Sequence, residues 1–404
     1  MITGDGTYIK KLNRSLIIRK IIEHGMISRA DLSKITGLNK ATISVQVAAL
    51  LEEQLIIESQ QEHHTVGRRP IMLSLNHRAG YVLGIDLDYG RMIYTLSDLS
   101  GVPVYSDLIH LPFFEYDEIV NRLTQLIQEA KKRCSVSLHG LIGVMIGIHG
   151  TVSKDETIFF VPKYQWHHKT LKSDLEAKLD VNISLENNAN LAAFAERVYQ
   201  YHQSNHLLCI NLASGIGSGI IIDGKILQGY HGYAGEMGHM IISPDGEPCK
   251  CGNRGCWELY ASESSLLQRL ALKKKQPNLT YEDIRLWIAE RDSTTMQQLE
   301  QFIKYLSVGL NNVINLYNPE TVVLNNEALT LYPDAIEKIK SQLKSSVSQY
   351  REITLSSLGK SACVMGACAI TIQQFLEVPE LRLNLDREHS GGRLTKLYGA
   401  APIY

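Results

Sequence analysis

The sequence lacks any apolar run long enough to cross a membrane. Its longest apolar stretch, 141–148, falls short of the roughly 18 residues that a membrane helix needs, and two glycines interrupt it. The first five residues show no basic segment followed by an apolar one, so we expect no secretory signal and a cytoplasmic location. We therefore expect neither a membrane protein nor a secreted one.

Cysteine is too scarce for a disulfide framework. Seven cysteines occur among 404 residues, and an odd number without a secretory signal fits a reducing compartment. Four of them lie in or beside apolar stretches, where we expect small buried side chains: Cys134, Cys209, Cys363 and Cys368. The other three fall within eight residues and need a different explanation.

The chain also has almost no net charge. It carries 41 lysines and arginines against 42 acidic residues, a net charge of −1, and proteins that bind nucleic acid are usually basic. This average hides a local difference. Residues 1–75 contain ten lysines and arginines against seven acidic residues, a net charge of +3, which leaves −4 for the rest. The neutral average therefore does not exclude DNA binding.

The first 75 residues carry the pattern of a helix-turn-helix. Hydrophobic residues recur at spacings of three and four from Leu12 to Ile22, which indicates an amphipathic helix. Ser28 is a typical N-cap for a second helix, and Asp31 supplies the acidic partner of a capping box. Gly37 then marks a turn before a third helix from about residue 40 to 54, so the order is helix, glycine turn, helix.

Two apolar segments after the third helix indicate a β-hairpin, or wing. They cover 55–58 and 71–75 and enclose a polar loop that contains Arg68 and Arg69. In such domains the second helix of the motif enters the major groove with its N-terminal residues, and wing arginines suit the minor groove or the backbone. We predict that residues 1–75 form a winged helix-turn-helix domain. The predicted DNA contacts are Ser28, Arg29, Asn39, Lys40, Ala41, Thr42, Ser44, Gln46, Arg68 and Arg69.

These side chains differ in what they can recognise. The amides of Asn39 and Gln46 can bind adenine with two hydrogen bonds, and the methyl groups of Ala41 and Thr42 can pack on thymine. Lys40 is better suited to a phosphate. The alternative is a three-helix bundle that binds another protein through its polar faces.

From about residue 76 the pattern changes to alternating strands and helices. Strand patterns at 80–87, 141–148, 182–186 and 207–212 alternate with helical patterns at 116–133, 171–179 and 189–203, which predicts an α/β fold. A glycine-rich strand pair, two long helices and a further strand then suggest a second lobe of the same kind. We place the lobes at 76–195 and 196–385, with a C-terminal helix that can return to the first lobe, and a tail at 386–404 without an assigned function.

Three cysteines and one histidine have the spacing of a metal site. Cys249, Cys251 and Cys256 lie close together with glycines between them, and His239 precedes them by ten residues. Three thiolates and one imidazole form a closed tetrahedral zinc site, which is structural because no position is left for water. The sequence therefore predicts a structural Zn²⁺ ion; the alternative is a set of reduced, unliganded thiols.

Two carboxylates flank this predicted metal site. They belong to Glu236 and Glu258, and carboxylate and imidazole groups are suitable partners for the hydroxyls of a sugar. His239 can bind the ion through one ring nitrogen and a hydroxyl through the other. We therefore predict a carbohydrate site that the zinc ion makes rigid.

Four motifs resemble the ROK family (repressors, open reading frames, kinases). They occupy 186–190, 214–219, 235–239 and 249–258, and the resemblance spans roughly residues 10–375. With the N-terminal segments 28–33 and 37–42, the chain looks most like the xylose-repressor branch of this family. The resemblance implies a two-lobed, actin-like fold of the sugar-kinase type (ribonuclease H-like), with the sugar in the cleft. It also implies a homodimer or a dimer of dimers.

The resemblance assigns residues to both sites. It gives zinc ligation to His239, Cys249, Cys251 and Cys256. It gives sugar contacts to Asn187, Asn188, Glu236, His239 and Glu258 and, more weakly, to the Gly147–Gly150 turn, where Gly150 is the candidate.

Two departures from the kinases of this family argue against catalysis. The kinases place an aspartate where this chain has Asn188, and an amide cannot serve as a general base. Their first phosphate loop reads Asp-x-Gly-Gly-Thr, whereas this chain has Asp-Leu-Asp-Tyr-Gly, and Asp88 adds negative charge where ATP would lie. The second loop, 214–219, keeps its glycines. We expect no enzymatic activity.

The predicted function is a sugar-responsive repressor of a carbohydrate-utilisation operon. A dimer would bind an operator with an inverted repeat, and a sugar inducer would release it. The resemblance favours xylose, and glucose or a glucose-containing oligosaccharide is an alternative inducer. Two other functions stay open: a bifunctional DNA-binding sugar kinase that uses ATP, and a zinc-stapled scaffold that binds DNA without a small ligand.

Overall fold

The computed structural model describes residues 6–60, 71–112 and 114–384. Its internal contacts divide the chain into two units. The first unit holds the chain up to Ile148, the segment Pro162–Glu186 and the C-terminal helix from Val364 onward. The second holds His149–Val161 and Asn187–Cys363. In the described part of the chain, no helix is long and apolar enough to cross a membrane.

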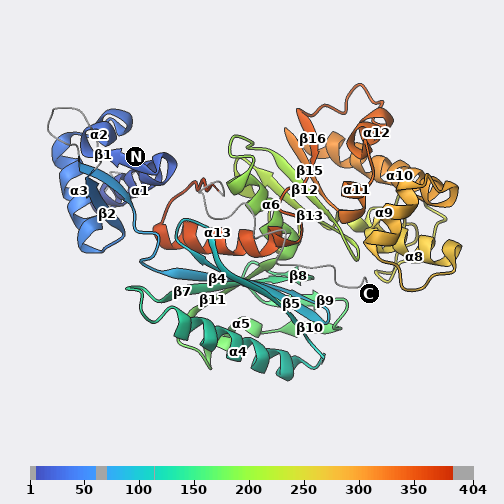
Figure 1. Ribbon diagram of the computed structural model, residues 1–404, viewed down its shortest axis with the longest axis horizontal. Coiled ribbons are helices and arrows are strands. Elements are labelled where there is room, and N and C mark those ends of the chain that lie inside the picture. Colours follow the sequence, from blue (N-terminus) through green and yellow to red (C-terminus); the bar gives the residue numbers. More distant parts are fainter. Residues whose placement is uncertain (1–5, 61–70, 113, 385–404) are drawn as a thin grey trace. The chain divides into compact units, whose positions relative to one another are not determined.

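Three helices and a three-stranded antiparallel sheet form the N-terminal part of the first unit (Figure 1). The elements are α1 (Gly6–His24), β1 (Met26–Ser28), α2 (Arg29–Thr36), α3 (Lys40–Glu52), β2 (Ile56–Gln60) and β3 (Ile71–Leu75). Strand β3 pairs with both β1 and β2. Ile17, Leu32, Ile43 and Leu50 are buried, so this part of the chain has its own hydrophobic core.

Short-range hydrogen bonds fix the ends of α2 and α3. The Ser28 hydroxyl accepts from the backbone N–H of Asp31 at 3.1 Å and donates to the carboxylate of Asp31 at 2.7 Å. Gly37 ends α2 with φ at 71°, in the left-handed region that favours glycine. Asn39 then caps α3 by accepting from the N–H of Thr42 at 2.8 Å. The predicted cap and glycine turn are confirmed.

A five-stranded sheet forms the rest of the first unit, with strand order β11-β7-β4-β5-β6. Its elements are β4 (Tyr81–Asp88), β5 (Arg91–Asp98), β6 (Pro103–His110), α4 (Tyr116–Arg133), β7 (Leu141–Ile148), β10 (Trp166–Lys169), α5 (Leu171–Glu176), β11 (Asn182–Asn187) and α13 (Ala362–Leu376). Strands β4, β5 and β6 are antiparallel, and β7 is parallel to β4. Helices α4 and α5 cover one face of the sheet, and α13 covers the other (Figure 1).

The second unit repeats this strand order. Its sheet runs β14-β13-β12-β15-β16: the first three are antiparallel, and β15 and β16 continue in parallel. The strands are β8 (Thr151–Val152), β9 (Ile158–Val161), β12 (Leu207–Leu212), β13 (Ile216–Ile222), β14 (Lys225–Ile226), β15 (Thr321–Asn325) and β16 (Glu352–Leu355). The helices are α6 (Asn188–Tyr199), η1 (Met237–His239), α7 (Glu258–Ala261), α8 (Glu263–Lys274), α9 (Tyr281–Ala289), α10 (Ser293–Tyr317), α11 (Glu327–Leu331), α12 (Ala335–Gln342) and η2 (Gly359–Ser361). The repeated α/β lobe that the sequence predicts is therefore present.

Helix α13 packs closely on the first sheet because one strand residue has no side chain. A Cβ atom at Gly84, in β4, would overlap the carbonyl oxygen of Val364 and lie 2.9 Å from Sγ of Cys368. All side chains of the helix from Ala362 to Ala369 are buried, so this part of the helix cannot move away from the strand without disturbing other packed residues. Close packing of this kind makes the position intolerant of added volume.

We expect Gly84→Ala to lower the free energy of unfolding by about 1–3 kcal/mol, because the nearest atom is a backbone carbonyl that cannot rotate away. The measurement is urea unfolding followed by circular dichroism. Gly6→Ala is a matched control, because a Cβ at Gly6 meets no atom within 4 Å. An unchanged midpoint for Gly84→Ala would contradict the close approach of β4 and α13.

Candidate functional site

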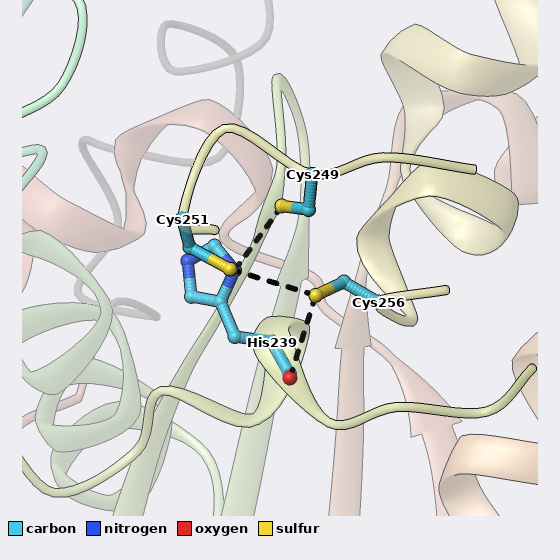
Figure 2. Close-up of side chains that lie close together, drawn as sticks. All are labelled: His239, Cys249, Cys251 and Cys256. Atoms are coloured by element: carbon cyan, nitrogen blue, oxygen red, sulfur yellow. Dashed lines mark hydrogen bonds between the residues drawn. The ribbon is translucent and has the colours of Figure 1, made fainter. Parts of the chain in front are cut away.

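Three cysteines and one histidine meet in the second unit (Figure 2). His239 ends the short helix η1, Cys249 and Cys251 lie in the following loop, and Cys256 lies just before α7. One ligand atom from each residue lies within 4.8 Å of the others. The Sγ atoms of Cys251 and Cys256 are 3.7 Å apart, and Sγ of Cys249 is 3.7 Å from Nδ1 of His239.

These separations fit a tetrahedral metal ion. Bonds of about 2.3 Å to sulfur and about 2.0 Å to nitrogen place two sulfur ligands about 3.8 Å apart, and a sulfur and a nitrogen about 3.5 Å apart. Burial, together with hydrogen bonds to the neighbouring thiols, raises the pKa of Cys256 to about 12. A cation reverses this effect, because it binds the thiolate and displaces the proton. The cluster can therefore hold a metal ion.

The two ring nitrogens of His239 face different groups. Nδ1 faces Cys249 and lies 3.5 Å from Oε1 of Glu258, whereas Nε2 lies 3.9 Å from Oε2 of Glu236. Oε1 of Glu258 also accepts a hydrogen bond from Cys249 at 3.5 Å. The structure therefore brings both predicted carboxylates next to the predicted metal ligand, one on each side of the ring.

Strand β13 connects this cluster to the start of helix α6. A Cβ at Gly217 would lie 3.3 Å from that of Ala189, in the first turn of α6. The hydroxyl of Ser218 donates to the carbonyl of Gly235 at 2.5 Å, and Gly235 immediately precedes Glu236. The segment that carries Glu236 and His239 and the helix that begins at Asn188 thus pack on the same strand.

Asn187 and Asn188 have different surroundings. Asn187 caps α6: its amide oxygen accepts from two backbone N–H groups of the first turn, and its Nδ2 donates to the carbonyl of Gly150 at 2.9 Å. The amide of Asn187 and the carbonyl oxygen of Gly150 therefore already form hydrogen bonds within the protein, and a sugar hydroxyl would have to bind the same atoms in addition. Asn188 is half-buried, and its Nδ2 lies 3.4 Å from Nδ1 of His149.

In the first unit, the groups of the turn that the sequence predicts as the first phosphate loop, at residues 88–90, are hydrogen-bonded within the protein. The N–H of Tyr89 donates to the Asp88 carboxylate at 2.7 Å, and the N–H of Gly90 donates to the hydroxyl of Tyr164 at 3.3 Å. Asp88 is buried and pairs with Arg91 at 3.0 Å and with Lys163 at 3.7 Å. Backbone donors that a phosphate would need are therefore already used.

The exposed face of α3 differs from the predicted one. Gln46 is only 4% exposed, and its amide donates to the backbone carbonyl of Lys10 at 3.3 Å, so the predicted base contact of Gln46 is wrong. The cause is helical phase, because Gln46 lies on the buried face with Ile43 and Val47. Asn39 uses one lone pair of its amide oxygen to cap α3, so a two-bond contact to adenine would have to share that oxygen.

The other predicted DNA contacts lie in varied surroundings. Lys40, Ala41 and Ser44 are exposed, and Thr42 is half-buried. Ser28 caps α2, and Arg29 pairs with Glu58 of β2 at 2.7 Å. Arg68 and Arg69 lie outside the described residues.

Sequence reasoning missed two exposed residues of α3 and one histidine. Val45, 62% exposed, and Ala48 continue the face that Ala41 and Ser44 begin. The spacing 41, 44, 45, 48 is the complement of the buried positions, and this phase could have identified them. The contact between His149 and Asn188 joins positions far apart in the sequence and leaves no local signal.

Comparison with known proteins finds relatives along most of the chain. Residues 82–374 match the ROK family. The chain is 37% identical over 383 residues to the xylose repressor of Bacillus spizizenii, a match that covers 94% of this chain and 99% of that protein. The structure is similar to the crystal structure of a ROK family transcriptional regulator described as a homologue of the E. coli MLC protein. The TM-score is 0.76 and the identity 28%, with 91% of this chain and 96% of that chain covered.

A sugar kinase has the same fold. A ROK family glucokinase from Streptomyces griseus, solved in complex with glucose and AMPPNP, matches with a TM-score of 0.63 and 24% identity, over 72% of this chain and 99% of that chain. At this level of identity the likeness concerns the fold alone. The described lobes therefore have the actin-like, sugar-kinase fold.

We expect the purified protein to hold about one metal ion per chain at the cysteine cluster, because four ligand atoms lie within 4.8 Å of one another and two of their separations, each 3.7 Å, fit a tetrahedral ion. Cys251→Ala should weaken metal binding by about tenfold or more and lower the melting temperature. The measurement is elemental analysis together with competition against a chelating dye. Cys134→Ala is the matched control, because it removes a buried thiol elsewhere. Full metal retention by Cys251→Ala would contradict the assignment.

Proposed function

The chain belongs to the ROK family, and on this premise we propose that it is a sugar-responsive, DNA-binding transcriptional repressor. The observation that carries the proposal is that the match to a xylose repressor covers nearly the whole chain, and so includes both the N-terminal helices and the two α/β lobes. The repressor would act on a carbohydrate-utilisation operon in the cytoplasm, and a sugar inducer would release it from its operator. Xylose is the first candidate inducer; glucose or a glucose-containing oligosaccharide is the second.

The N-terminal part is proposed to be a winged helix-turn-helix that binds operator DNA. Helices α2 and α3, joined by the Gly37 turn, form the motif, and strands β2 and β3 form the base of the wing. The exposed residues Ala41, Ser44, Val45 and Ala48 are small, so the helix can approach base edges closely, and Val45 can contact the methyl group of thymine. A homodimer would place two such helices on an inverted repeat.

The sugar site is proposed to lie beside a structural Zn²⁺ ion. Cys249, Cys251, Cys256 and Nδ1 of His239 would hold the ion, which when bound fixes the loop. Nε2 of His239 is then directed toward Glu236, and these groups together with Glu258 and Asn188 would bind sugar hydroxyls. The ring orientation that a bound ion imposes on His239 supports this arrangement.

A bifunctional sugar kinase is the second candidate, and several observations disfavour it. Asn188 cannot accept a proton from the attacking hydroxyl. At the turn that we propose corresponds to the first phosphate loop, two backbone N–H groups and the Asp88 carboxylate are bonded within the protein, and Asp88 pairs with the nearby cations Arg91 and Lys163, which are then not free to bind phosphate. We propose that this chain binds a sugar without phosphorylating it.

Sugar and operator binding are linked through the arrangement of the two lobes. If the sugar favours an arrangement that binds the operator poorly, each ligand weakens the binding of the other by the same factor. A coupling free energy of about 1–3 kcal/mol would change operator affinity roughly 5- to 150-fold. This range is sufficient for induction.

The decisive experiment is a gel-shift titration against the DNA upstream of the chain's own gene, with a panel of sugars. We expect one sugar of the panel to release the DNA. Glu258→Gln should remove this release and weaken sugar binding by about tenfold or more, because the amide loses a charged hydrogen bond, yet it should leave operator binding intact. Metal content is measured in parallel, because Glu258 contacts two metal-ligand residues.

Other outcomes of this experiment separate the candidate functions. Loss of both operator binding and sugar release in Glu258→Gln would make Glu258 structural. Turnover of ATP with any sugar at the rate of a sugar kinase would overturn the repressor-only proposal. An intact, metal-loaded protein that no sugar stabilises in a thermal shift would favour the scaffold that binds DNA without a ligand.

The face of α3 provides a second test. Val45→Asp should weaken operator binding by about tenfold or more, because a carboxylate would face the phosphates of the groove. Sugar binding and stability should not change, because Val45 is 62% exposed. Val347→Asp is the matched control, since Val347 is 71% exposed in the second unit. Wild-type operator affinity in Val45→Asp would remove α3 from the interface.

A further inference from the structure

His149, which has no assigned role, contacts Asn188, which is a predicted sugar-binding residue. His149 directly follows β7, and Asn188 is the first residue of α6. Nδ1 of His149 lies 3.4 Å from Nδ2 of Asn188, and both side chains are half-buried, so a ligand can reach them. The sequence had pointed to this turn only weakly, through Gly150.

The chemistry of the two groups determines how they are oriented. Nδ2 of an asparagine is only a donor, so the ring nitrogen that faces it must be unprotonated and must accept. The proton of the neutral ring then resides on Nε2. With its NH₂ group directed toward His149, Asn188 directs its amide oxygen to the opposite side. A neutral ring with its proton on Nε2 therefore favours the amide orientation in which the oxygen of Asn188 is directed away from His149.

We propose that His149 is a positioning residue, which holds Asn188 so that its amide oxygen accepts a hydrogen bond from one hydroxyl of the sugar. This inference rests on the proposed sugar-binding function and deepens it. Asn188 cannot take a proton, so its use is recognition rather than catalysis. An oriented acceptor distinguishes a hydroxyl from a hydrogen at one ring position, which makes the pair a determinant of sugar specificity.

A neighbouring tie supports this role. Nδ2 of Asn187 donates to the carbonyl of Gly150 at 2.9 Å, so two consecutive residues of α6 bond to two consecutive residues of the turn after β7. Space is also restricted here, because a Cβ at Gly150 would overlap the carbonyl oxygen of Phe160. The turn and the helix start are therefore fixed together before any sugar binds, and preorganisation lowers the entropic cost of binding.

The test compares two replacements of His149. His149→Leu removes the acceptor and leaves the amide free to rotate, whereas His149→Gln keeps an acceptor oxygen for Nδ2 of Asn188. Calorimetric titration would use xylose, glucose and their monodeoxy analogues. We expect His149→Leu to bind the inducing sugar about tenfold or more weakly and to lose discrimination against one deoxy analogue. His149→Gln should stay within about threefold of the wild type and keep that discrimination.

A double-mutant cycle separates positioning from a structural role. If His149 acts through Asn188, then adding His149→Leu to Asn188→Ala should change sugar affinity no further. In all variants, the operator affinity without sugar and the melting temperature should equal the wild-type values. These two measurements check that each variant is folded. A full additional loss in the double variant, or equal damage by His149→Leu and His149→Gln, would overturn the proposal.

The wild-type protein distinguishes failure of this inference from failure of the proposed function. If no sugar binds to the wild type or releases it from the operator, the sugar-responsive function itself is wrong. If the wild type responds and His149→Leu responds with the same affinity and discrimination, only the role of His149 is wrong.

Discussion

The approach of β4 to helix α13 is possible only because Gly84 has no side chain, and this contact fixes the C-terminal helix on the sheet of the first unit. The first residues of α13, Ala362 and Cys363, belong to the second unit, and the helix continues in the first. Directly after α13, Glu377 pairs with Lys11 at 2.8 Å and Glu380 pairs with Arg19 at 3.1 Å, both on α1. Within the first unit, helix α13 therefore packs on the sheet, and the segment directly after it pairs with the N-terminal helix α1.

Hydrogen bonds within the protein occupy polar groups at the carboxyl ends of strands in both sheets. The turn at Asp88 satisfies its own backbone donors, and a similar closure occurs where β15 ends. There, Asn325 donates to the carbonyl of Gly359 at 3.0 Å and Asn326 donates to that of Leu212 at 2.9 Å. Ligands of open α/β sheets bind at the carboxyl ends of the strands. Polar groups at these ends that bind one another are not available to a nucleotide, which agrees with a sensor.

Features set by short-range chemistry could be predicted from the sequence. The cap at Ser28, the Gly37 turn and the clustering of three cysteines with His239 depend on spacing, because neighbours in the chain are neighbours in space. Gln46 was assigned from its place in the helix rather than from the phase that Ile43 and Val47 define, and burial contradicted it.

Long-range features could not be predicted in this way. The contact between His149 and Asn188 joins residues 39 positions apart, and only the folded sheet and helix bring them together. The domain boundaries near 75, 195 and 385, the dimer and the inducing sugar stay predictions.

Most of the positively charged side chains near the N-terminus form ion pairs within the protein. Six of the eight described lysines and arginines before residue 60 pair with carboxylates; Lys10 and Lys40 form no ion pair with a described residue. The electrostatic part of DNA affinity grows with the number of phosphates neutralised, so one chain would bind weakly, which favours the proposed dimer. Two of the paired residues, Lys11 and Arg19, attach α1 to the segment after α13. The exposed pair of Lys11 with Glu377 contributes about 0–1 kcal/mol, whereas the Arg19 side chain is partly buried.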